Sequence, residues 1–364
     1  MSKMEKSLFW FWLYNIEGIG LVSRRKLLDY YETPERIYDE ATEDVLDQLK
    51  IAKRACYNLL NSRKDEKIRS VYEQIQKKGI RVITRADESY PERLKHIYDP
   101  PGVLYVRGRL PEESKKSIAI VGARECSNYG KEIALHFARE LAKQGIQIIS
   151  GLARGVDRYS HIGTLEQDGK TFAVLGCGID ICYPKENIDT YMEIIETGGI
   201  ISEYPPGFQP IAANFPMRNR IISGISDGIL LVEARQKSGS LITMDYGLDQ
   251  GKNIYACPGR ITDTLSYGTN HIIQMGGKLV MSPEDIFEDF GLHESEGSCV
   301  GKEILGGVEL QVYDCLELMP KHIEEILQET GLTMEQVSEV LFQLQLTGCI
   351  KQVAGNYYSK TMSK

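Results

Sequence analysis

Between residues 80 and 285, short apolar runs alternate with amphipathic helical patterns, and this alternation constrains the fold more than any other feature of the chain. Nine runs fit strands: 80–84, 103–108, 118–122, 146–150, 171–176, 199–202, 228–234, 253–257 and 277–281. Between two of them lies GKEIALHFARELAKQG, whose apolar helical face consists of Ile133, Ala134, Phe137, Ala138 and Leu141. Strands that are apolar on both sides and separated by helices form mostly parallel sheets. We therefore predict an α/β fold, a mostly parallel sheet with helices on both faces.

The segments before and after this region have different patterns. Residues 1–78 show helical spacing, and IEGIG at 16–20 looks like a helix-hairpin-helix turn, for which a plain connector between helices is the alternative. Residues 291–307 are polar and glycine-rich, which is typical of a linker. Residues 308–364 fit three helices and a hairpin, the outline of a winged helix. We expect a helical domain of the SAM or helix-hairpin-helix kind (1–78), a sheet domain (79–290), the linker and a winged helix.

The charge balance limits the partners that the chain can bind. Its 364 residues carry a formal net charge of −8, so contact with nucleic acid requires a local basic patch. The winged-helix segment holds more acidic residues than lysines, which favours contact with a protein. No apolar run reaches the ~20 residues that span a bilayer, and the apolar start lacks the cleavage site of a signal peptide. We expect a cytoplasmic protein without membrane contact.

The cysteines give no sign of a metal site. Eight cysteines are scattered along the chain, and none of their spacings is typical of zinc ligands. Reduced thiols in a cytosolic protein are the simpler interpretation. We expect neither a metal nor a cofactor.

Two glycine-containing turns follow neighbouring strands of the predicted sheet. In IVGAR, Gly122 lets the backbone approach a phosphate, and the guanidinium of Arg124 can bind it. A turn glycine beside a solvated arginine is the alternative. SGLARGVDRYSH follows the next strand and contributes a second turn and a second cation: Ser150, Gly151, Arg154 and Gly155.

Three further segments carry candidates for anion or base binding. The loop GCGIDICYPKEN offers Lys185, for which a solvated surface lysine is an equal alternative. The segment NFPMRNR combines an aromatic ring, on which a base can stack, with polar groups: Phe215, Arg218, Asn219 and Arg220. We expect one of its two arginines to form an ion pair instead. The helix start KSGS offers hydroxyl and N–H groups at Ser238, Gly239 and Ser240.

These five segments should lie along one edge of the sheet, because they follow its strands or open its helices. Together they would line a groove whose cations are Arg124, Arg154, Lys185, Arg218 and Arg220. No set of nucleophile, base and orienting residue accompanies them. A site rich in anion-binding groups and poor in catalytic ones indicates binding rather than turnover, and several such loops in a row suit a strand of nucleic acid.

The sequence resembles the DprA/Smf family of DNA-processing proteins along nearly its whole length. The blocks that carry the resemblance are YPERLKHIYDPPGVLYVRG, SIAIVGAR, SGLARGVDRYSH, YPKEN, FPMRNRIISGIS, SGSLIT and ACPGRITDTLSYGTNHIIQMGG, in this order. The resemblance implies an extended Rossmann-like domain that binds single-stranded DNA and dimerises, and a protein that helps load RecA recombinase. It implies DNA contacts at Arg124, Lys185 and Phe215. One departure is Ala212, which stands where relatives often carry a lysine.

A nucleotide-processing enzyme is the alternative function. Rossmann-like sheets also serve phosphoribohydrolases that act on nucleoside monophosphates, which use a PGGxGT loop and a catalytic glutamate. Here the comparable helix start is SGSLIT, and Glu233 is the obvious nearby acid. A dinucleotide-dependent oxidoreductase is excluded, because G-x-G-x-x-G is absent after the first central strand.

Overall fold

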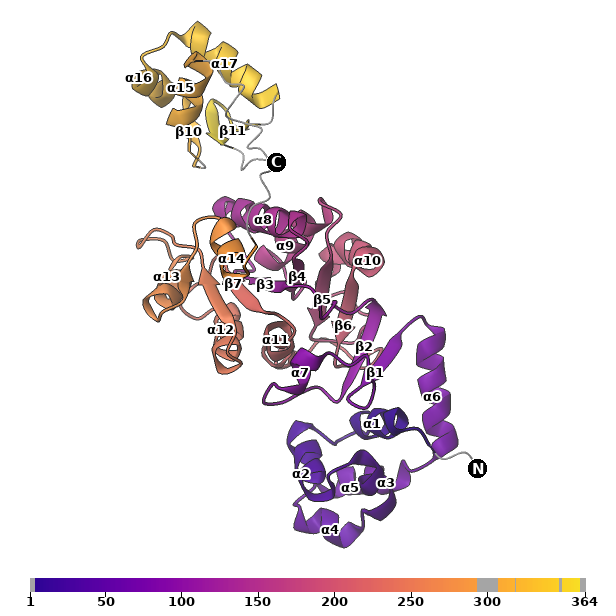
Figure 1. Ribbon diagram of the computed structural model, residues 1–364. Coiled ribbons are helices and arrows are strands. Elements are labelled where there is room, and N and C mark those ends of the chain that lie inside the picture. Colours follow the sequence, from indigo (N-terminus) through magenta and orange to yellow (C-terminus); the bar gives the residue numbers. More distant parts are fainter. Residues whose placement is uncertain (1–3, 293–306, 318, 347–348, 361–364) are drawn as a thin grey trace.

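The computed structural model describes residues 4–292, 307–317, 319–346 and 349–360, and it confirms the predicted fold class (Figure 1). Within these residues one large sheet runs in the order β1-β2-β6-β5-β4-β3-β7-β8-β9. Strands β3 to β9 pair in parallel, whereas β1 and β2 are antiparallel to their neighbours at one edge. The strands are β1 (Arg81–Thr84), β2 (Val103–Gly108), β3 (Ser117–Val121), β4 (Gln147–Ser150), β5 (Thr171–Leu175), β6 (Gly199–Ser202), β7 (Gly228–Leu231), β8 (Asn253–Ala256) and β9 (Lys278–Leu279). Each predicted strand is present.

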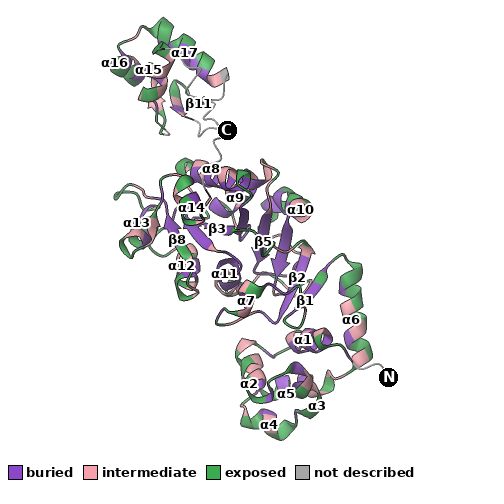
Figure 2. Ribbon diagram, viewed as in Figure 1, coloured by how far each residue is buried: buried purple, intermediate pink, exposed green. Residues whose placement is uncertain are grey.

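The two faces of the sheet build two apolar layers, which explains why the strands are apolar at successive positions (Figure 2). On β3, Ala119 and Val121 point into one layer, and Ile118 and Ile120 point into the other. The helices that pack around the sheet are α7 (Glu92–Lys95), α8 (Asn128–Lys143), α9 (Val156–Leu165), η1 (Lys185–Asn187), α10 (Ile188–Thr197), α11 (Asn214–Gly224), α12 (Gly239–Asp249), α13 (Tyr267–Gln274) and α14 (Glu284–Asp289).

Helix α8 shows how the sequence sets these helices. Ser127 caps its start by accepting a hydrogen bond from the backbone N–H of Gly130. The predicted apolar face is buried against the sheet, and Phe137 is 1% exposed. The chain then returns to β4 at the opposite edge of the sheet, so α8 begins at the carboxyl edge of the strands.

The first part of the chain is helical, as predicted. Its helices are α1 (Lys6–Tyr14), α2 (Leu21–Tyr31), α3 (Pro34–Glu40), α4 (Glu43–Gln48), α5 (Lys53–Asn61) and α6 (Asp65–Lys77). The IEGIG segment joins α1 to α2, and its Gly18 has a φ of +86°. The helices contact the sheet region through the Ser7 hydroxyl, which donates to Asp87, and the Tyr105 hydroxyl, which donates to Asn15 over 2.9 Å. The proposed phosphate contact of IEGIG stays a prediction.

The last part of the chain forms a small separate core with winged-helix composition. Its elements are α15 (Gly307–Cys315), β10 (Lys321–His322), α16 (Ile323–Thr330), α17 (Met334–Leu346), β11 (Ile350–Ala354) and β12 (Tyr357–Lys360). The three strands make one sheet in the order β10-β12-β11. The predicted linker, 291–307, lies almost entirely outside the described residues. None of the described helices is long and apolar enough to cross a membrane.

Candidate nucleic-acid interface

A pocket of about 590 Å³ opens at the carboxyl edge of the sheet. It lies between the loops that follow β3 and β7, where the strand order reverses, and this switch point is the usual ligand site of open α/β sheets. Helices α9, α11 and α12 begin at the same edge and bring their free N–H groups toward it. Most of the predicted residues line the pocket: Gly122, Arg124, Arg154, Phe215, Arg218, Asn219, Ser238, Gly239 and Ser240.

Two of the predicted glycines are required for the local backbone. An added Cβ at Gly122 would lie 2.7 Å from the Val156 side chain, so only glycine lets β3 pass this close to α9. Gly155 has a φ of +71°, and a Cβ there would collide with the carbonyl oxygen of Ala123. Both glycines therefore hold the first two loops against each other. Gly155 does so without lining the pocket.

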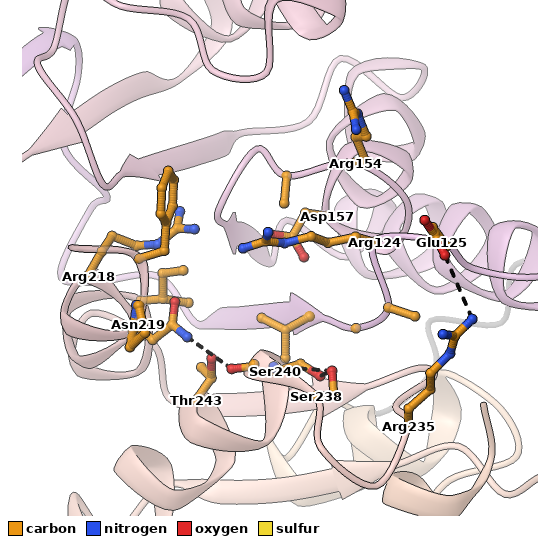
Figure 3. A pocket seen from close by; sticks show the side chains of 18 of the residues that line it. Arg124, Glu125, Arg154, Asp157, Arg218, Asn219, Arg235, Ser238, Ser240 and Thr243 are labelled. Atoms are coloured by element: carbon orange, nitrogen blue, oxygen red, sulfur yellow. Dashed lines mark hydrogen bonds and ion pairs between the residues drawn. The ribbon is translucent and has the colours of Figure 1, made fainter. Parts of the chain in front are cut away.

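Positive charge dominates the lining of the pocket. Figure 3 shows Arg124 lying across its middle, with Arg218 and Asn219 at one end and the ion pair of Arg235 with Glu125 at the other. Arg124 is exposed and forms no ion pair within the described part of the chain. Arg154 lies at the rim and pairs with Glu186. A basic patch of this kind is what an acidic protein needs to attract phosphate.

An aromatic ring lies among these cations. The Phe215 ring centroid is 5.8 Å from the guanidinium carbon of Arg124 and 6.0 Å from that of Arg218, which are cation–π distances. The Tyr183 ring lies 5.5 Å away, tilted by 38°. Gly176 lies beneath the Phe215 ring, where an added Cβ would approach it to 3.0 Å. The ring is partly exposed at the pocket surface.

Arg218 is part of the pocket wall rather than a solvated cation. Its side chain is buried, and its Nη1 donates to the carbonyl oxygens of Gly151, over 2.7 Å, and Val174. An added Cβ at Gly151 would collide with this guanidinium, so that glycine makes room for the arginine. Burial, together with repulsion from Arg124, lowers the pKa of Arg218 to about 10, although Asp157 opposes the shift.

Three of the predicted residues do not line the pocket, and the prediction that Arg220 does so is wrong. Arg220 is 3% exposed and pairs with Glu203 over 2.8 Å and with Asp99, which is the ion-pair role expected of one of the two arginines. Ser150 is buried, and its hydroxyl donates to the Ile120 carbonyl over 2.7 Å. Lys185 is exposed in η1, beside the pocket rather than in it.

Comparison with known proteins assigns the chain to a family. The family model for DNA recombination-mediator protein A matches residues 81–291, more than half of the chain, and that for the DprA winged helix domain matches residues 302–356. The chain belongs to the DNA recombination-mediator protein A family. This confirms the resemblance seen in the sequence.

Several members of this family are similar over most of their length. DNA processing protein DprA of Bacillus subtilis is 40% identical over 224 residues, which cover 61% of this chain and 75% of that protein. Protein Smf of Escherichia coli is 37% identical over 287 residues, 76% of each chain. The X-ray structure of DprA from Streptococcus pneumoniae matches with a TM-score of 0.66 and 31% identity, covering 80% of this chain and 100% of that one. A structure concerned with the single-stranded DNA binding mode of Helicobacter pylori DNA processing protein A matches with a TM-score of 0.52 and 30% identity, covering 58% and 95%.

Two cations of the pocket escaped the sequence analysis. Arg235 and Lys237 both lie in the loop after β7 and line the pocket. Lys237 is exposed and forms no ion pair among the described residues, and it directly precedes the Ser-Gly-Ser turn. A lysine next to an anion-binding turn was the available signal. Lys237 offers this member of the family a cation that Ala212 does not supply.

Glu233, the acid on which the alternative function depends, has a structural partner. Its carboxylate is buried and accepts hydrogen bonds from the backbone N–H of Ser127, over 2.9 Å, and from the Ser127 hydroxyl. It does not line the pocket. Glu233 therefore ties the start of α8 to the loop after β7, which gives no support to a catalytic role.

Proposed function

We propose that the chain binds and protects single-stranded DNA in this pocket and helps load RecA recombinase onto it during recombination or natural transformation, without catalysing a reaction. The observation that carries the proposal is the Phe215 ring set between Arg124 and Arg218 in a net-acidic chain. An unpaired base can stack on such a ring while the guanidinium groups bind the flanking phosphates. The Helicobacter pylori relative, which is described by its single-stranded DNA binding mode, supports the same assignment.

A single strand suits the site better than a duplex. In a duplex the faces of the bases are stacked on each other, so no base is free to lie on Phe215. The pocket, at about 590 Å³, is on the scale of a small-ligand site rather than of a double helix. We therefore propose that duplex DNA binds only through its phosphates, and more weakly.

The RecA partnership is supported by the family, which is described as that of a recombination mediator. A mediator has to hold the single strand and then give it up to the recombinase. We place this activity in the cytoplasm, where RecA acts. No described residue is assigned to the RecA contact.

Filter binding with oligo-dT and with duplex DNA of equal length, each with and without RecA, tests this function. We expect oligo-dT to bind about tenfold or more tightly than the duplex at the same salt concentration. We also expect the protein to speed RecA assembly on the single strand. Equal affinity for the two DNAs would contradict the assignment of the pocket, and unchanged RecA assembly would contradict the mediator role alone.

We infer that two copies associate through the Rossmann-like domain. The edge strand β9 and its flanks carry exposed apolar side chains, among them Leu279 and Met281, which is 77% exposed. An edge strand flanked by apolar groups is suited to contact with another chain. Replacing both residues by aspartate should convert a dimer to a monomer in light scattering, whereas Met192→Asp, at an exposed position on α10, should not. A double variant that stays dimeric would rule out this surface.

A further inference from the structure

Beneath the outer pocket lies a smaller compartment of about 50 Å³. Its walls include Arg124, Arg154, Arg218, Tyr183 and Phe215. A volume of this size holds roughly three to five water-sized groups, which matches a tetrahedral oxyanion and is too small for a nucleobase. Arg235 and Lys237 line the outer pocket but not this compartment.

Arg218 brings unused hydrogen-bond donors to the compartment. Its side chain is 5% exposed, and its Nε is buried without any hydrogen-bond partner in the described structure. Both hydrogen bonds that its guanidinium makes to the protein use Nη1. A buried N–H without a partner is costly, so a ligand that accepts this hydrogen bond would be stabilised.

The compartment also has an excess of positive charge. Arg124 has no acidic partner among the described residues, and repulsion between Arg124 and Arg218 contributes to the lowered pKa of Arg218. The nearest acid is Asp157, whose carboxylate already accepts the backbone N–H of Gly151 over 3.1 Å. Guanidinium groups that converge in this way are stabilised by an anion placed between them.

The shape of the compartment restricts which phosphate can enter. Arg218 is fixed to the carbonyl oxygens of Gly151 and Val174, so its inner side is closed by backbone. A phosphate there has room for one ester substituent leading out past Phe215, whereas an internal phosphodiester has two. We propose that this compartment binds a phosphate monoester, the terminal phosphate of a single strand or the phosphate of a free nucleotide, in preference to an internal phosphodiester. The strand form of this inference rests on the proposed binding of single-stranded DNA.

Fluorescence anisotropy with short dT strands tests the proposal. Strands with a 5′-phosphate, a 3′-phosphate or only hydroxyl ends are compared at fixed salt, and thermal shifts are measured with dTMP and with thymidine. We expect a phosphorylated strand to bind about 3- to 10-fold more tightly than the hydroxyl strand, and dTMP but not thymidine to raise Tm. A preference for one phosphorylated end identifies that end as the source, and a response to dTMP identifies the free nucleotide.

Variants separate this compartment from general electrostatic attraction. Arg124→Gln and Arg154→Gln should abolish the ratio between phosphorylated and hydroxyl strands. Arg235→Gln, which removes a cation from the outer pocket alone, should weaken both strands and keep the ratio. Because Arg218 is buried, Arg218→Lys is included only if its melting curve matches that of the parent, and it too should abolish the ratio.

The outcomes distinguish this inference from the function on which it rests. Equal affinity for phosphorylated and hydroxyl strands, with no response to dTMP, overturns the inference and leaves single-strand binding in place. A loss of the ratio in Arg235→Gln as large as that in Arg124→Gln overturns it as well. If no strand binds but dTMP stabilises the protein, the proposed function fails and the monoester site stands.

Discussion

Replacing Arg124 by alanine is expected to weaken binding of oligo-dT by about 10- to 100-fold, because it removes a charge-assisted hydrogen bond to phosphate worth roughly 1.5–3 kcal/mol. Arg124 lies across the middle of the pocket, exposed and without an ion pair among the described residues. Each phosphate contact on a single strand contributes about −0.7 to the slope of log K against log salt. The slope should therefore become shallower by about that amount in a salt titration followed by filter binding.

The control for Arg124→Ala is Lys143→Ala. Lys143 is an exposed cation in the last turn of α8, at the edge of the sheet opposite the pocket, and its ion pair with Glu140 is solvent-exposed. Its removal should leave both the affinity and the slope unchanged. Lys185→Ala should lie between the two, since Lys185 is next to the pocket without lining it. If Arg124→Ala binds like the parent at every salt concentration, the strand does not lie in this pocket.

The fold followed from the sequence because its signals are local. A strand covered on both faces needs an apolar side chain at every position, as in Ile118 to Val121, and such runs are visible without any knowledge of the partners. The order of the strands was not visible in the same way. The antiparallel pairing of β2 with β6 joins residues far apart in the chain, and nothing within either strand encodes it.

The site was predictable as a set of loops, but less so as individual side chains. Parallel strands end at one edge, which brings the turns at Gly122 and Gly151 together whatever their side chains do. Arg218 and Arg220 show the limit of this reasoning. Two positions apart on a helix they point about 200° away from each other, so one faces the pocket and the other pairs with Glu203. The apolar pattern around them did not tell which.

Phe215→Ala is expected to cost roughly 1–3 kcal/mol of single-strand affinity, which is the usual contribution of one base stacked on an aromatic ring. The ring presents its partly exposed surface to the pocket between Arg124 and Arg218, so a base on it would lie within reach of both guanidinium groups. The substitution removes no charge. Affinity for oligo-dT should therefore fall about 5- to 100-fold while the salt slope stays that of the parent, in contrast to Arg124→Ala.

Phe215→Trp is the matched variant for this prediction, because it keeps an aromatic face at the same position on α11. It should retain most of the affinity that Phe215→Ala loses. Melting curves of both variants check that the walls formed by Gly176 and Tyr183 are intact. An unchanged dissociation constant in Phe215→Ala would remove stacking from the mechanism and leave binding to the arginines alone. A shallower salt slope in the same variant would mean that the ring acts by positioning Arg124 or Arg218 rather than by holding a base.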